Sequence, residues 1–77
     1  MILTQEIISA LNAKYTAQKL EANTNLINYF NNPSGIGEHP NIVGEVDKLI
    51  SQIAEAQGKM DIVETIVKLI NESSNNR

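Results

Sequence analysis

One stretch of this chain, NNPSGIGEHPN at residues 31–41, gathers several residue types that could do chemistry. This stretch holds the single histidine, both prolines and two of the four glycines. A bend at Gly35 and Gly37 can point successive backbone N–H groups into a concavity that suits phosphate or carboxylate. His39 could add a donor, and the helix that follows would add its positive N-terminus. The stretch therefore predicts an anion site, although Glu38 opposes one and the Gly-Lys-Ser/Thr ending of a phosphate loop is absent.

The same stretch also has a purely structural interpretation. Pro33 would end a preceding helix, because the residue before a proline is pushed out of the α region. Pro40 suits the first turn of a following helix, where its missing N–H costs nothing. The glycines would then only shape the turn, and His39 would be free to vary. The sequence leaves both interpretations open, a binding site and a connector.

A second candidate site lies earlier in the chain. Lys14, Tyr15 and Lys19 form its only compact basic–aromatic group. The neighbouring Ala13 and Ala17 are small enough to leave room for a ligand between subunits. Tyr15 would then stack on a base, and the lysines would meet phosphates as point charges. In the alternative interpretation, Tyr15 packs between helices while both lysines stay in water.

No combination of residues typical of an enzyme is visible. One histidine, no cysteine and no glycine-framed serine leave no nucleophile–base pair. The Glu-x-x-His spacing of helix-bundle metal sites is missing, and most carboxylates of the second half fall where a helix would face solvent. We therefore expect a non-catalytic protein that uses neither a metal nor a cofactor.

The elements that must position these residues are helical. No glycine or proline interrupts residues 4–31, and the apolar residues there recur at helical spacing. Thr4 is the expected N-cap, since its hydroxyl can accept a bond from a free N–H group of the first turn. The apolar residues form a first row of Ile8, Leu11, Tyr15, Ala22, Leu26 and Tyr29, and a second row of Ile7, Ala13, Ala17, Leu20, Ile27 and Phe30.

The second half shows a stronger helical pattern, which predicts a helix over 41–72, after a turn over 32–40 and before a frayed tail over 73–77. Its apolar residues alternate at steps of four and three, the heptad seam of coiled-coil packing. Glycine disfavours a helix interior, so Gly58 could bend this helix or divide it, which would give three helices. The seam consists of Ile42, Val46, Leu49, Ile53, Ala56, Met60, Val63, Val67 and Ile70, and the apolar face is widened by Val43, Ile50, Ile62, Ile66 and Leu69.

Two helices of matched length with a short link predict an all-α antiparallel hairpin. A chain of 77 residues has only a marginal core, and this one has no cysteine that could add a disulfide. Two helices share a single groove, so the remaining apolar surface would stay in water. We therefore expect a homo-oligomeric helical bundle, either a dimer of hairpins or a larger ring.

The stretch NPSGIGEHPNI, with NYFN before it and EVDKL after it, resembles a motif of small uncharacterised helical proteins of large tailed bacteriophages. The resemblance covers about a quarter of the chain. It implies a viral accessory protein and carries over no catalytic residue. Small phage proteins that sequester nucleotide immune signals bind by the stacking and lysine contacts described for Tyr15. The resemblance thus favours an anti-defence or host-takeover role, and a structural assembly module is the alternative.

The net charge of −3 argues against non-specific binding to nucleic acid or to a membrane surface, which needs a basic patch. No apolar run approaches the roughly 18–20 residues of a membrane span, and the N-terminus lacks a signal-peptide pattern. We expect a protein of the host bacterial cytoplasm. Its expected partners are other copies of itself, together with a host protein or a small nucleotide-like ligand.

Overall fold

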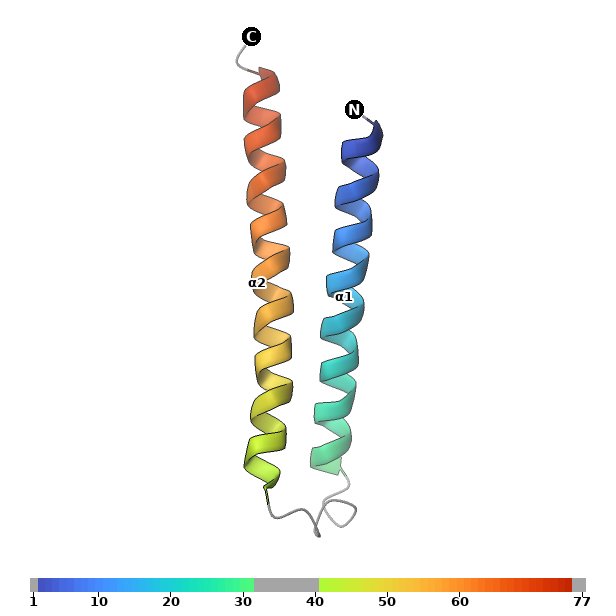
Figure 1. Ribbon diagram of the computed structural model, residues 1–77, viewed down its shortest axis with the longest axis vertical. Helices are drawn as coiled ribbons and strands as arrows, with labels where there is room; N and C mark the ends of the chain where they lie inside the picture. Colours follow the sequence, from blue (N-terminus) through green and yellow to red (C-terminus); the bar gives the residue numbers. More distant parts are fainter. Residues whose placement is uncertain (1, 32–40, 76–77) are drawn as a thin grey trace.

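The computed structural model describes residues 2–31 and 41–75, and nearly all of them lie in two long helices. Helix α1 spans Ile2–Asn31 and helix α2 spans Ile42–Asn75. The helices pack side by side and run antiparallel (Figure 1), which confirms the expected hairpin. We call the end where α1 begins and α2 ends the open end, and the opposite end the turn end.

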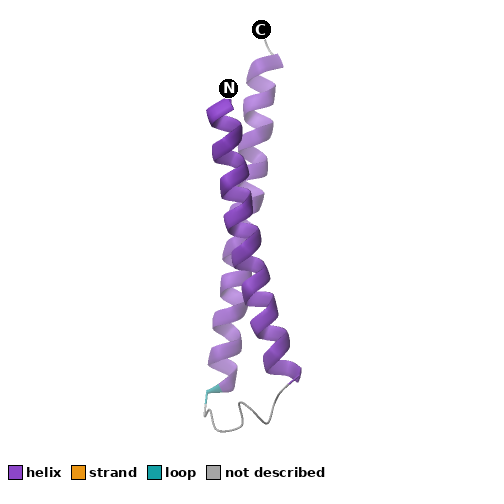
Figure 2. Ribbon diagram, turned by 90° about the vertical axis from the view of Figure 1, so that its right-hand side faces the viewer, coloured by secondary structure: helices purple, strands orange, loops and turns teal. Residues whose placement is uncertain are grey.

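The molecule is a thin rod. Its extents are 61 × 18 × 14 Å, and its radius of gyration is 17.7 Å. A compact chain of this length would have a radius of gyration of about 11.5 Å. The view in Figure 2 shows that no third layer covers the described helices. Each helix therefore buries only the stripe that faces the other helix.

Both helices extend beyond their expected bounds at the open end. Helix α1 starts at Ile2, so Thr4 lies half-buried inside the first turn and is not the N-cap. Helix α2 continues to Asn75, through part of the tail that was expected to fray over 73–77. The tail contains no glycine or proline that would stop a helix.

Asn41 caps the start of α2. Its carbonyl accepts a bond from the Glu45 N–H at 3.1 Å, and its side-chain Oδ1 accepts one from the Gly44 N–H at 3.1 Å. This is the geometry of an N-cap, which satisfies a donor that the first helical turn leaves free. The sequence predicted a helix over 41–72 and placed Pro40 at its first turn, without identifying Asn41 as the cap. Pro40 and Pro33 both lie outside the described residues.

Helix α2 passes through Gly58 as one continuous helix. No residue of the described segments has a positive φ, so Gly58 adopts a backbone conformation open to other residues. A Cβ placed on Gly58 would meet nothing within 4 Å. Neither backbone nor packing within the hairpin therefore demands glycine there.

The core between the helices is narrow. Only four described apolar residues are buried, and two of them are alanines: Ala22, Leu49, Ala56 and Val63. The other members of the first row of α1 are half-buried. Along the seam of α2, Ile42, Val46, Ile53, Met60 and Val67 are half-buried, and Ile70 is 40% exposed. The first row of α1 and the heptad seam of α2 thus face each other, and two of the four buried residues between them are small.

Much apolar surface lies outside this core. The second row of α1 is exposed throughout, as are the five residues that widen the apolar face of α2. Among the described residues, eleven large apolar side chains are exposed. A hairpin with more large apolar groups in water than in its core is only marginally stable alone.

Candidate functional site

The basic–aromatic group lies at the middle of the hairpin, and α2 contributes a residue to it that the sequence analysis missed. Tyr15 is half-buried between the helices. The Nζ of Lys59 lies 5.5 Å from the centroid of the Tyr15 ring, within cation–π range. In the sequence, Lys59 stands beside the seam residue Met60, so a position near α1 could have been expected. Its contact with Tyr15 could not, because the sequence does not show how the two helices are aligned.

Lys19 is held by the hairpin itself. Its Nζ donates a hydrogen bond of 2.5 Å to Oε1 of Gln57, across the helix pair. Gln57 in turn donates from Nε2 to Oδ1 of Asp61 at 2.9 Å. This polar chain links α1 to α2 close to the buried Ala56, where apolar packing is thin. Lys19 therefore has a structural partner and does not extend freely into solvent.

Lys14 is the freest of the three lysines around Tyr15. It is exposed and takes part in none of the ion pairs found within residues 2–31 and 41–75. Ala13 and Ala17 are exposed as well, on the outer surface of α1. The space that these alanines leave is open to solvent or to another molecule.

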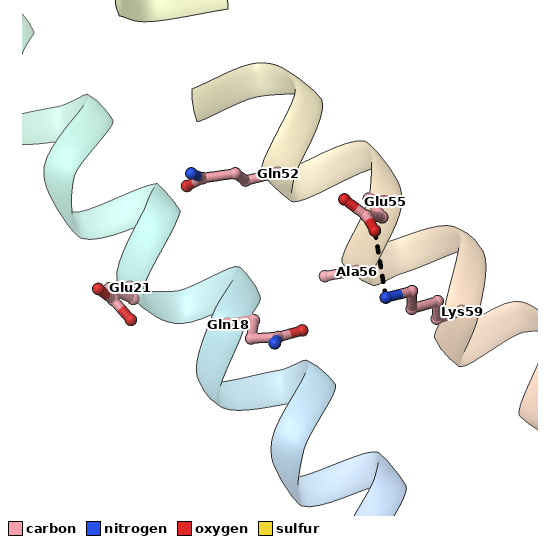
Figure 3. Close-up of a pocket in the computed structure, with 6 residues that line it drawn as sticks. All are labelled: Gln18, Glu21, Gln52, Glu55, Ala56 and Lys59. Carbon is pink, nitrogen blue, oxygen red and sulfur yellow. Dashed lines mark ion pairs between the residues drawn. The ribbon is translucent and has the colours of Figure 1, made fainter. Parts of the chain in front are cut away.

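A polar pocket lies between the helices, and Lys59 is one of its lining residues (Figure 3). Its volume is about 260 Å³, slightly below the roughly 300–1,000 Å³ of typical ligand pockets. Figure 3 shows Gln18 and Ala56 pointing into the gap, whereas Glu21 points away from α2. We call it the central polar pocket; it is lined by Gln18, Glu21, Gln52, Glu55, Ala56 and Lys59.

The charges of the central polar pocket do not favour an anion. Its one lysine, Lys59, is paired with Glu55, with 3.1 Å between Nζ and Oε1. Glu21 adds a second carboxylate, so the lining carries one positive and two negative groups. The glutamine amides can donate and accept hydrogen bonds. A single hairpin thus offers a polar hollow but no excess of positive charge.

Tyr15 is also restricted as a stacking platform within one hairpin. The Tyr15 side chain is half-buried between the helices, and Lys59 lies over its ring. A base that stacked there would have to take the place of Lys59. Stacking therefore requires Lys59 to move.

The other candidate residues, Gly35, Gly37 and His39, lie outside the described residues. In the part of the chain that the structure describes, no three or more His, Cys, Asp or Glu residues are grouped so that they could hold a metal ion. Neither α1 nor α2 contains a stretch long and apolar enough to cross a membrane.

No protein-family model matches this chain, and no curated protein or solved structure matches it either. The candidate site is therefore judged on its own chemistry. That chemistry is a tyrosine beneath a lysine, a cross-helix Lys–Gln–Asp chain and one free lysine, beside a small polar pocket.

Proposed function

We propose that this protein acts by binding, without catalysing a reaction, as a homo-oligomeric helical bundle. The observation that carries the proposal is the exposed apolar surface. Eleven large apolar side chains are exposed in the described helices, whereas four apolar residues are buried. Apolar surface of this extent typically marks an interaction site.

We further propose a phage accessory protein of the anti-defence or host-takeover type, which works in the host bacterial cytoplasm. The support for this setting is the resemblance of the NPSGIGEHPNI motif. The target is either a host protein or a small nucleotide-like anion. The exposed apolar faces suit a protein surface, and the exposed Lys14 beside Tyr15 could contact an anion.

An anionic ligand would need more than one hairpin. The central polar pocket holds two carboxylates against one paired lysine, and it is small. Lys14 is exposed on α1, beside the open space at Ala13 and Ala17. A second copy placed over this surface could bring a second Lys14 and enclose the ligand. The proposed ligand site therefore lies between copies, with Lys14 as its main cationic contact.

A thermal-shift screen of the full chain against nucleotides and cyclic dinucleotides tests whether the protein binds a nucleotide-like anion. A ligand at 100 times its Kd should add about 2.7 kcal/mol to the free energy of unfolding. For a domain of this size the corresponding rise in Tm is roughly 10 °C or more. Lys14→Ala should abolish the shift. Lys68→Ala, which removes another exposed lysine, should leave it in place.

If no nucleotide raises the Tm, a nucleotide-like anion is rejected as the target. Affinity capture from phage-infected bacteria then tests a host protein as the target, with an unrelated helical hairpin of similar charge as the control bait. If neither experiment yields a specific partner, the binding proposal fails. A structural module, in which the bundle itself is the functional part, is then the better account.

A further inference from the structure

The exposed apolar side chains of the two helices fall into two separate groups, one at each end of the rod. The open-end patch consists of Leu3, Ile7, Ile62, Ile66, Leu69 and Ile70. The turn-end patch consists of Leu20, Ile27, Phe30, Val43 and Ile50. Each patch draws residues from both helices, because the helices run antiparallel.

The two patches also lie on opposite faces of the hairpin. At about 100° per residue, Ile27 lies about 160° around α1 from Ile7, and Ile50 lies about 160° around α2 from Ile66. Ile7 and Ile66 line one apolar groove together, so they share a face. The turn-end patch is therefore on the other face.

Each face is polar where it lacks a patch. On the face of the open-end patch, the turn end is lined by polar residues that include Asn25, Asn28 and Lys48. On the opposite face, the open end is lined by residues that include Gln5, Ser9 and Asn71. Neither patch therefore extends along the rod, and no single flat partner can cover both.

The surface area agrees with two interfaces for each chain. The chain exposes 6046 Å². A globular monomer of 8.5 kDa exposes about 4,650 Å², so the excess is roughly 1,400 Å². A stable interface buries roughly 800 Å² on each partner. The excess is thus close to what two small interfaces would cover.

We propose that the two patches are two separate interfaces between copies of this chain, each patch pairing with the same patch of another copy. A second copy is the occupant because a hairpin whose described helices bury only four apolar residues needs its partner whenever it folds, and its own chain is always present then. Pairing of like patches forms closed two-fold contacts. Because the patches lie on opposite faces, the two contacts join each chain to two different copies, whereas pairing of unlike patches would join successive copies head to tail.

This inference rests on the proposed homo-oligomeric function, and mass measurements on matched variants test it. One variant carries Ile62→Glu with Leu69→Glu in the open-end patch. A second carries Leu20→Glu with Ile27→Glu in the turn-end patch. These four side chains are 58–63% exposed, so the hairpin core is left intact. The control carries Ser9→Glu with Asn25→Glu, which adds the same charge on the polar part of each face.

Sedimentation velocity measures the mass of each assembly, and circular dichroism measures its helicity. We expect at least four chains in the wild-type and control assemblies. Each patch variant should remain helical as a dimer of about 17 kDa, twice 8.5 kDa. A patch variant that is monomeric, unfolded or unchanged in mass overturns the inference. Variants that are monomeric alone and form a dimer of about 17 kDa only when mixed would show that unlike patches pair. A folded wild-type monomer would also contradict the proposed homo-oligomeric function, whereas the other outcomes would not.

Discussion

Neither the backbone nor the contacts of the hairpin explain why position 58 is a glycine. It lies inside α2, adopts no positive φ, and has open space where a Cβ would project. Glycine costs about 1 kcal/mol relative to alanine in a helix interior. Gly44, the other glycine of α2, differs because a Cβ there would collide with the side chain of Asn41, which caps the helix.

Gly58→Ala should therefore raise the free energy of unfolding by about 1 kcal/mol. For a chain of this size the expected rise in Tm is about 4–8 °C, measured by thermal melting. Gly44→Ala is the matched control. It should gain nothing comparable, because Asn41 must move and the cap is weakened. A lower Tm for Gly58→Ala would show that the helix breaks at this residue or that another copy packs closely against it.

The roles of Asn41 and Lys59 were not predicted from the sequence, for different reasons. Asn41 is a favourable cap, but Pro40 also suits the first turn of a helix, so the sequence did not single out Asn41. Lys59 lies over Tyr15 only because the helices pair in one particular register. Helical periodicity identifies which face of each helix is buried, but it does not align one helix with the other.

At the scale of the element, the heptad pattern of α2 was the strongest signal in the chain. An unbroken alternation of four and three steps predicted one long helix, and α2 runs without a break from Ile42 to Asn75. The pattern also indicated which side chains face α1. It placed Ala56 in the seam, but it did not reveal that Ala22 and Ala56 would be the most deeply buried of the described apolar residues, or that the Lys19–Gln57 bond would link the helices near them.

The seam itself is tested by Ile53→Asp. Ile53 is half-buried toward α1, so the substitution places an unpaired carboxylate in the contact between the helices. We expect the free energy of unfolding to fall by about 3 kcal/mol or more, seen as loss of helicity in circular dichroism. Ser51→Asp adds the same charge at an exposed position two residues away and should have little effect. Equal melting of the two variants would show that the seam does not hold the hairpin together.

At the scale of the whole molecule, the described part of the hairpin has a narrow core, three exposed ion pairs, one lysine–glutamine bond across the helices and one cation–π contact. Exposed ion pairs contribute roughly 0–1 kcal/mol each. The sequence predicted self-association from the width of its apolar surface. The division of that surface between opposite faces and ends depends on how the helices pair, so it became visible only in the folded hairpin.

We expect this protein to fold only as an assembly of its own chains. The most direct test is the mass of the unmodified chain in solution, measured by sedimentation at micromolar concentration together with its helicity over a dilution series. We expect a mass of at least 17 kDa, twice 8.5 kDa, and helicity that falls as dilution separates the chains. A species of 8.5 kDa that keeps its full helicity on dilution would contradict the account.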